Sequence, residues 1–373
     1  MRIVTALILM LFAARPVIAT YAFAIPGLVN GKPIRVAFNT CGGQSGLYQH
    51  AARRLGLTIH SPPSDAKGVV GFCRDCRFQL SGSPAMTTNV WVLPSHPLAP
   101  QNRIDGLLFW VDMTDPVVNI NGAERRVEGL SSLPPRTDDW LTCAKSNESS
   151  DLAFRVPGEK TKIIVATGSS HGVHLCSTLW DRWCAPHTDA PTTLIAEVTA
   201  AGEVRVVEEM WASELTLGSL TLRDIPVRLC PPDAERKGVK IALGAYALRQ
   251  VELLVDREQE KVHVRSLPAK DARYEHNRLG AVFVPETLQN ADLVAHVAAS
   301  SPAQGADIRN GDVLLSIGNL DTTRWRTDPR VLPLNRFWSR PAGTQLHVTL
   351  RRGQQILSRT VTLEEILRPD DDS

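Results

Sequence analysis

The chain has 373 residues, of which 43% are hydrophobic, and its formal net charge is +2 at pH 7. This length exceeds one ordinary domain, so we expect two or three domains. A net charge this small gives no reason to expect binding to nucleic acid or to a membrane surface. The 25 Gly and 25 Pro are scattered between short Val-, Ile- and Leu-rich runs, which favours a mainly β chain.

The N-terminal 22 residues are typical of an export signal. Arg2 is followed by an apolar stretch and then by small residues such as Ala19 and Ala22. About a dozen apolar residues are too few to span a bilayer but suit the core of a signal peptide. We therefore predict a signal peptide over residues 1–22 and an exported protein, periplasmic or secreted. An uncleaved signal that anchors the chain in the membrane is the alternative, and we expect no other membrane span.

After this segment the sequence repeats itself. A shift of 127 residues places "NGKPIRVAFNTCGG" on "PGEKTKIIVATGSS", with Thr40 on Thr167. A shift of 135 residues places "LLFWVDMTDPVVNINGAERRVEGL" on "LGAYALRQVELLVDREQEKVHVRSL". Because both matches keep the same order at nearly constant offset, they indicate two tandem units. We place these all-β units over residues 23–135 and 150–268.

Each copy contains the same predicted elements. An alternating strand leads to a Thr- and Gly-containing turn, then to a loop and a short helix, "LYQHAARRLGL" in the first copy and "STLWDRW" in the second. Further strands follow, and each copy closes on a hairpin. The turns of the two hairpins are predicted to be Asn121-Gly122 and Asp256-Arg257.

These elements resemble a known family. The stretch "VNGKPIRVAFNTCGGQSGLYQHAARRLGL" is similar to the opening of a retropepsin-like aspartic protease lobe, and "IIVATGSS", "LTLGSLTLRDIPV" and "ALGAYALRQVELLVD" resemble the same family. The resemblance implies two tandem acid-protease β-barrel lobes in one chain. In this family each lobe supplies one aspartate, and the pair shares a proton while activating a water molecule.

Neither aspartate of that family is present here. The first copy has Asn39 and the second has Ala166 at the corresponding positions, and neither side chain can ionise. Loss of the pair removes most of a rate advantage of several orders of magnitude, so we expect no cleavage. The candidate catalytic positions, predicted to be inactive, are Asn39, Thr40, Ala166, Thr167 and Gly168. An active aspartic endopeptidase with displaced acids is the alternative, and the acids considered are Asp105, Asp112 and Asp181.

The cysteines and two histidines suggest a third class of activity. Cys73 and Cys76 form a single CxxC, one pair among seven cysteines, and they suit a local disulfide or two buried thiols better than zinc. His171 and His174 lie three residues apart in a Gly-containing loop, which we expect to be a polar loop rather than a metal site. We predict no metal and no cofactor. Thiol or metal chemistry at the CxxC is the remaining hypothesis.

The C-terminal part, residues 276–366, resembles a bacterial, protease-associated PDZ domain. The resemblance rests on "SSPAQGADIRNGDVLLSIGN", where Ser301 precedes a short helix and Gly311-Asp312 forms the turn before a strand. Domains of this kind bind a peptide C-terminus as an added strand, with the carboxylate on backbone N–H groups. The matching peptide-binding residues are Leu279, Gly280, Ala281, Val282 and Phe283. The alternative is a pocket that is occupied by the protein itself or serves only to pack against the lobes.

Together these patterns predict a mainly β protein with two tandem retropepsin-like β-barrel lobes followed by an α+β PDZ domain. The expected function is the binding of extended peptides or protein C-termini through a cleft between the lobes and through the PDZ domain. The expected partner is therefore a peptide or protein, and not a nucleic acid.

Overall fold

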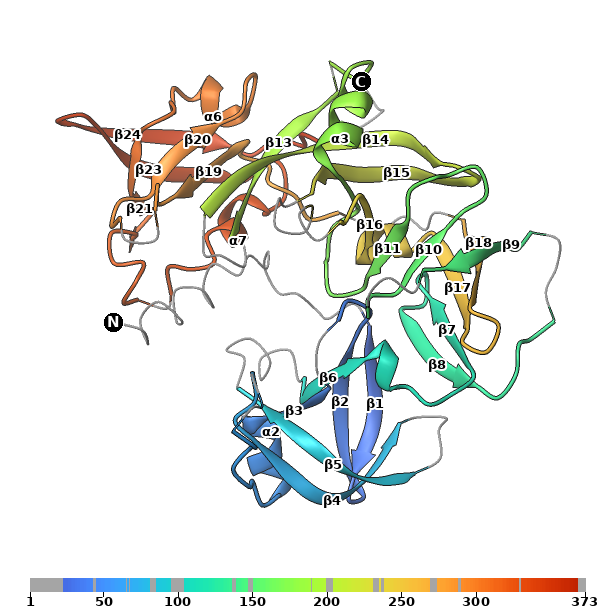
Figure 1. The fold of residues 1–373 in the computed structure, drawn as a ribbon. Helices are drawn as coiled ribbons and strands as arrows, with labels where there is room; N and C mark the ends of the chain where they lie inside the picture. The colour runs from blue at the N-terminus through green and yellow to red at the C-terminus, as the bar shows by residue number, and fades with distance from the viewer. Residues whose placement is uncertain are drawn as a thin grey trace.

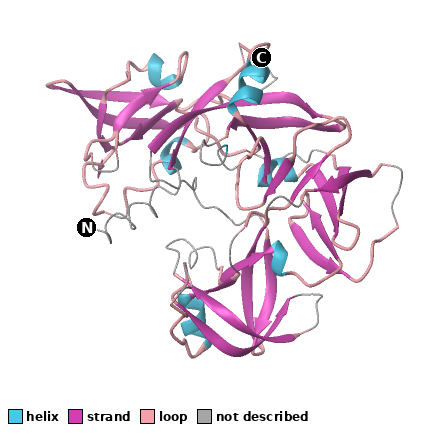
Figure 2. Cartoon of the chain, viewed as in Figure 1, coloured by secondary structure: helices cyan, strands magenta, loops and turns pink. Residues whose placement is uncertain are grey.

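In the computed structural model the protein is mainly β (Figures 1 and 2). The predicted signal peptide lies outside the described residues. Within the described part of the chain, no helix has the length and apolar character needed to cross a membrane. The structure describes residues 23–42, 45–64, 66, 68–80, 85–94, 104–135, 139–146, 150–188, 190–198, 204–230, 235, 238–268, 274–287, 290–328 and 330–367.

The first copy of the repeat contains a closed barrel with the strand order β1-β2-β6-β3-β5-β4. Along β2, Ile34, Val36 and Phe38 are buried while Arg35 is exposed, because alternate side chains of a strand point to opposite faces. The elements are β1 (Ala24–Val29), β2 (Lys32–Asn39), β3 (Gly46–Tyr48), α2 (Gln49–Leu55), β4 (Gly71–Leu80), β5 (Met86–Leu93), β6 (Gly106–Phe109), η1 (Trp110–Asp112), β7 (Val117–Asn121) and β8 (Arg126–Leu130).

The second copy belongs to a 12-stranded sheet with the order β13-β14-β15-β12-β16-β11-β10-β9-β18-β17-β7-β8. Its elements are β9 (Leu141–Lys145), β10 (Ala153–Arg155), β11 (Ile163–Ala166), β12 (Val173–Leu175), α3 (Ser177–Cys184), β13 (Thr192–Val198), β14 (Val204–Leu217), β15 (Leu220–Leu229), β16 (Ile241–Gly244), α5 (Ala245–Leu248), β17 (Val251–Asp256) and β18 (Lys261–Ser266).

Equivalent strands of the two copies make equivalent pairings. β2 runs parallel to β6 with Asn39 opposite Phe109, and β11 runs parallel to β16 with Ala166 opposite Gly244. β3 lies antiparallel on β6, as β12 does on β16. The 127- and 135-residue shifts found in the sequence place each of these strands on its counterpart, so the internal repeat is also a repeat of structure.

The closing hairpins of the two copies pair with each other through β7 and β17. The predicted two-residue turns are wrong, because each hairpin closes with the four residues 122–125 or 257–260. Asn121 Oδ1 accepts an N–H bond from inside its loop, and Asp256 Oδ1 accepts two. These two side chains therefore cap longer loops, which is a common role of Asn and Asp beside a turn.

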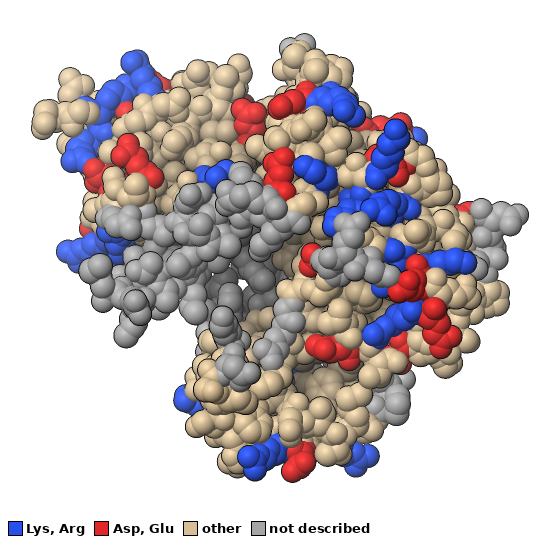
Figure 3. Space-filling view, in the orientation of Figure 1, with Lys and Arg blue, Asp and Glu red and all other residues tan. Residues whose placement is uncertain are grey.

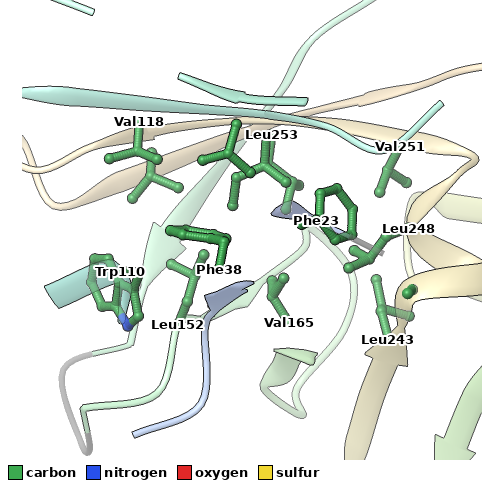
Figure 4. Close-up of a cluster of buried hydrophobic side chains, with 14 of the residues drawn as sticks. Phe23, Phe38, Trp110, Val118, Leu152, Val165, Leu243, Leu248, Val251 and Leu253 are labelled. Carbon is green, nitrogen blue, oxygen red and sulfur yellow. The ribbon is translucent and has the colours of Figure 1, made fainter. Parts of the chain in front are cut away.

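One hydrophobic core extends through both copies. Figure 4 shows Phe23 and Phe38 of the first copy packed among Val165, Leu243 and Leu253 of the second. All five side chains are at most 2% exposed. Because burial of each large apolar side chain contributes about 1.5–3 kcal/mol, this shared core ties the two copies into one packed unit.

The C-terminal module has its own sheet, ordered β19-β20-β21-β23-β24 with β22 paired to β21, and its own core. The helix predicted after Ser301 is confirmed, since the Ser301 side chain accepts the N–H of Gln304 as its cap. The turn at Gly311 has a φ of +88°, which glycine adopts readily. The elements are β19 (Ala281–Val284), β20 (Val294–Val297), α6 (Pro302–Gly305), β21 (Val313–Ile317), β22 (Leu320–Asp321), α7 (Asn335–Trp338), β23 (Gln345–Arg352) and β24 (Gln355–Thr362).

Charged side chains of both signs are interspersed on the face shown in Figure 3. In the described part of the chain several charged side chains form close pairs, such as Arg223 with Glu214 at 2.9 Å and Arg126 with Glu124 at 3.1 Å. The described residues of this face therefore present alternating charge rather than a broad patch of one sign, in keeping with the small net charge of the chain.

Candidate binding site between the two copies

Thr40 and Thr167, the matched threonines of the two copies, bind each other's backbone. The Thr40 N–H donates to Thr167 Oγ1, and the Thr167 N–H donates to Thr40 Oγ1, both at 3.1 Å. The Thr40 hydroxyl donates to Val165 O at 2.6 Å, and the Thr167 hydroxyl donates to Phe38 O at 3.0 Å. Both threonines are buried. The two predicted turns therefore meet through one crossed set of four hydrogen bonds, which we call the threonine crossing.

Asn39 and Ala166 precede the two threonines and are half-buried. The Asn39 side chain packs against the turn of the second copy. A Cβ atom added to Gly168 in that turn would be 3.4 Å from Asn39 Nδ2. Its Oδ1 accepts the N–H of Cys41 at 3.0 Å. Ala166 packs, as Cys41 does, against a small apolar cluster. The predicted positions are thus brought together, but they offer an amide, hydroxyls and a methyl, which do not exchange protons as carboxylates do.

Asp151 is an acid at this junction that the sequence did not indicate. Its Oδ1 accepts the N–H of Gly42 at 2.7 Å, although the two residues are 109 positions apart. Burial raises the pKa of the Cys41 thiol to about 12, with a further contribution from the charge of Asp151. The thiol therefore stays protonated and is a poor nucleophile. A single acid bonded to backbone is not the pair that acid–base hydrolysis of a peptide needs.

The displaced acids considered from the sequence lie on separate elements. Asp105 accepts from Arg54 Nη2 at 2.7 Å and from the Arg35 N–H at 2.9 Å. Asp112, in η1, accepts a hydrogen bond from the Ser45 hydroxyl. Asp181 is exposed on α3. Asp105 and Asp112 are therefore engaged by groups of the first copy, and Asp181 belongs to the helix of the second.

A cavity of about 440 Å³ lies in the first copy, and none of its lining residues belongs to the threonine crossing. Ser45 on its rim accepts the N–H of Phe109, the residue paired with Asn39, at 2.7 Å. The rim therefore adjoins the first turn. Apolar side chains predominate in the lining, with polar groups at Ser45, Thr88, Asn89 and Asp112; the remaining lining residues are Val36, Gly46, Leu47, Phe78, Met86, Val90, Trp91, Leu107 and Leu108.

The strand beside this cavity has an unpaired edge. Residues 86–91 of β5 pair with β4 on one side, whereas β3 reaches β5 only at Val92 and Leu93. Among the described residues, no strand pairs with the other edge of residues 86–91. An open edge beside an apolar pocket provides both backbone groups and a side-chain site for an extended peptide.

The CxxC cysteines lie at a bulge of β4. The register with β5 shifts between Cys73 and Cys76, and Asp75 between them has a φ of +50°. Both thiols are buried and form no disulfide. Burial, and next the neighbouring Cys76, raise the pKa of the Cys73 thiol to about 11. Among the described residues, no group of three or more His, Cys, Asp or Glu side chains is placed to hold a metal ion.

His171 and His174 are buried in a polar network of the second copy, and His174 lies in β12 rather than in the loop predicted from the sequence. His174 Nε2 accepts from Arg228 Nε at 3.0 Å and lies 3.3 Å from Ser169 Oγ. His171 Nδ1 lies 3.0 Å from the hydroxyl of Tyr274, in the segment that leads to the C-terminal module. This "His-Arg network" extends from the second turn toward the C-terminal module, which the spacing of the histidines alone does not reveal.

The predicted carboxylate-binding loop of the C-terminal module is already occupied. The N–H groups of Leu279 and Gly280 donate to Asn277 Oδ1 at 3.0 and 3.2 Å. Leu279, Ala281, Val282 and Phe283 are at most 3% exposed. A peptide carboxylate would therefore have to displace the Asn277 side chain before it reached these amides. No pattern in the sequence indicated this role of Asn277.

Comparisons with known proteins assign no family. No family model and no curated protein matches the chain. Among solved structures, basic 7S globulin from soybean is 9% identical with a TM-score of 0.38, over 67% of this chain and 93% of that one. Conglutin gamma, a basic 7S globulin from lupine seeds, is also 9% identical, with a TM-score of 0.36 over 65% and 90% of the two chains.

The family assignment made from the sequence is therefore corrected. Neither a retropepsin-like protease model nor a PDZ model matches the chain, and the two similar structures above are 7S globulins. The motifs misled because they are short. A Thr-Gly turn after an apolar strand and a Gly-Asp turn before one specify local backbone geometry, which unrelated β proteins share.

Proposed function

We propose that this is an exported protein that holds an extended peptide segment without cleaving it. In this proposal residues 23–135 and 150–268 act as two β lobes that meet at the threonine crossing, and residues 276–366 form a third module. Export is proposed from residues 1–22 alone. The observation that carries the binding proposal is the edge of residues 86–91 of β5, which no described strand pairs with, beside the 440 Å³ cavity.

The chemistry of the cavity indicates the kind of segment. A peptide added to the edge of β5 would form backbone hydrogen bonds and place alternate side chains toward the cavity. The lining from Leu47, Phe78 and Leu108 suits a large apolar or aromatic side chain. Asp112 and Ser45 on the rim would accept a hydrogen bond from a donor at the end of that side chain. We expect a preference for an aromatic residue.

The absence of cleavage follows from the residues at the crossing. General acid–base catalysis of amide hydrolysis needs a group that takes a proton from water and one that polarises the carbonyl. The Asn39 amide cannot take the proton, and the Ala166 methyl can do neither. The alternative is an endopeptidase that uses displaced acids, which Asp112 on the cavity rim and Asp151 at the first turn favour.

Blocking the cavity should weaken binding. The probe is a fluorescein-labelled ten-residue peptide with one central Phe, and binding is measured by fluorescence anisotropy. Thr88→Trp places an indole in the cavity and should weaken binding about 10- to 100-fold, because a lost apolar anchor is worth about 1.5–3 kcal/mol. Thr87→Trp is the matched control, since Thr87 is the exposed neighbour on the same strand and is not among the residues that line the cavity.

Recovering the probe peptide after incubation distinguishes binding without cleavage from endopeptidase activity. After incubation with the wild-type protein at pH 4 and at pH 7, mass spectrometry should find the peptide intact. Fragments whose formation requires Asp112 or Asp151 would establish the endopeptidase instead. Equal binding by the Thr88→Trp and Thr87→Trp variants, or no binding by the wild type, would remove the proposed site.

A further inference from the structure

Two buried cysteines follow the ends of the neighbouring strands β12 and β15. The strands run parallel, and their register pairs His174 with Arg228 and continues for one more residue on each strand. Cys176 and Cys230 come directly after these last pairs, and the Cys230 N–H donates to Leu175 O at 2.7 Å. Both cysteines are at most 2% exposed, and neither forms a disulfide in the structure. The two cysteines therefore continue the register of the strands as its next pair.

Strand alternation places the two cysteine side chains on the same face of the sheet. Residues two apart on a strand share a face, so Cys176 lies on the face of His174 and Cys230 on the face of Arg228. The side chains of that earlier pair meet, because Arg228 Nε donates to His174 Nε2 at 3.0 Å across 54 positions of the chain. The cysteines have the same separation along the chain. We therefore expect their side chains to face each other in the same way.

The spacing of the two strands suits a disulfide. Neighbouring strands of a sheet lie about 4.8 Å apart, and a disulfide joins residues whose Cα atoms are about 4.4–6.8 Å apart. The bond would therefore need no change of strand register. Another contact already holds the same two segments together, since the hydroxyl of Ser177, the first residue of α3, donates to Glu235 Oε1 at 2.8 Å. α3 also packs beside β15 (Figure 1).

We propose that Cys176 and Cys230 form a disulfide, which links the start of α3 to the end of β15. The reaction is thiol–disulfide exchange with a small disulfide such as oxidised glutathione. One cysteine thiolate attacks a sulfur of the reagent, which gives a mixed disulfide and releases one glutathione thiolate. The other cysteine thiolate attacks the protein sulfur of the mixed disulfide and releases the second. The protein thus loses two electrons and two protons, and the reagent leaves as two thiols.

This bond lies in the second copy, away from the cavity of the first, and it does not depend on the peptide binding proposed there. An oxidising compartment outside the cytosol would maintain such a bond. Because both thiols are buried, we expect the exchange to occur while the chain folds or when the strand ends open.

Peptide mapping tests which cysteines become linked. The full chain is reduced in denaturant and refolded with reduced and oxidised glutathione, and the remaining thiols are alkylated. Trypsin separates Cys176, Cys184 and Cys230 into the peptides 163–182, 183–205 and 229–236. Mass spectrometry should find 163–182 joined to 229–236, and dithiothreitol should separate them. Folded, oxidised protein in which these two peptides are unlinked, or in which either is joined to 183–205 instead, would overturn the proposal.

Stability gives a second, independent measurement. Oxidation should lower the equilibrium constant of unfolding about 30-fold or more, because the bond closes a long loop in the unfolded chain. Cys176→Ser should lose this gain. Cys184→Ser, on the same helix, is the matched control and should keep it, because Cys184 Sγ lies 3.7 Å from Met210 Sδ in β14. A disulfide elsewhere, such as within the CxxC, would form in both variants. Equal gains for the two variants in urea denaturation of oxidised and reduced samples would therefore also contradict the proposal.

Discussion

Thr40→Val should lower the free energy of unfolding by about 2–6 kcal/mol, because it leaves two buried backbone groups without their partners at about 1–3 kcal/mol each. These groups are the Thr167 N–H, which now donates to Thr40 Oγ1, and Val165 O, which accepts from the Thr40 hydroxyl and would keep only the weak donor Cys41 Sγ at 3.4 Å. Valine has the shape of threonine, so the change removes the hydrogen bonds while keeping the packing. Chemical denaturation followed by circular dichroism measures the loss.

Thr40→Ser is the control for this prediction. Serine keeps the hydroxyl and loses only a methyl group, so it should be considerably less damaging than valine. Thr167→Val should cost about as much as Thr40→Val, because it leaves the Thr40 N–H and Phe38 O without partners. The double variant should lose less than the sum, since the two residues belong to one bonded set. Equal losses for Thr40→Ser and Thr40→Val would show that the crossing contributes no more than packing.

The repeat is the part of this fold that the sequence predicted best. The two copies form the same strands and bury them in the same way. The match of Thr40 with Thr167 in the sequence was therefore enough to identify the two turns as equivalent. The sequence could not show that each threonine binds the backbone of the other copy. That arrangement depends on how the two copies face each other, which no local pattern encodes.

In the C-terminal module the sequence predicted local turns but not the long-range contacts. Local turn chemistry predicted the helix after Ser301 and the turn at Gly311. Local turn chemistry could not show that the Leu279–Phe283 loop is occupied by Asn277, because Asn277 is also held by Leu194, which is 83 positions away. Asp151 at the first turn was not predicted for the same reason, because its partner Gly42 is 109 positions away in the sequence. Short motifs fix the backbone nearby, whereas the occupant of a site is set by long-range contacts, and the family resemblance built on such motifs was wrong.

Acid should destabilise the protein through the His-Arg network. Burial, next the charge of Arg228 and then His171 lower the pKa of His174 well below 6.5. As the pH falls below 6.5, the unfolded chain therefore takes up a proton at His174 before the folded protein does. The unfolded state then binds more protons, so stability falls as the pH falls. One proton is worth up to about 1.4 kcal/mol per pH unit, so the loss grows as the pH falls from 6.5 toward the lowered pKa of the folded state.

The neighbouring acid titrates in a lower window. Burial alone would raise the pKa of Glu209, but His171, Arg228 and the Tyr274 hydroxyl outweigh it and lower that pKa below its usual 4.5. Glu209 therefore adds stability above about pH 4.5, which is lost only at lower pH. Burial and the carboxylate of Glu209 raise the pKa of Tyr274 well above 10, so this tyrosine stays neutral throughout. The range from pH 7 to 5 thus isolates histidine titration from these two groups.

His174→Gln identifies the residue responsible. Glutamine keeps an acceptor for the Arg228 Nε–H but cannot take up a proton in this range. The variant should be less stable than the wild type at pH 7, because its amide fits the network less well. Below pH 6.5 its free energy of unfolding should then fall less steeply than that of the wild type, by up to about 1.4 kcal/mol per pH unit. Since the two proteins differ only at this residue, the difference between the two urea-denaturation series reports the effect of His174, and parallel series would mean that its proton does not couple to folding.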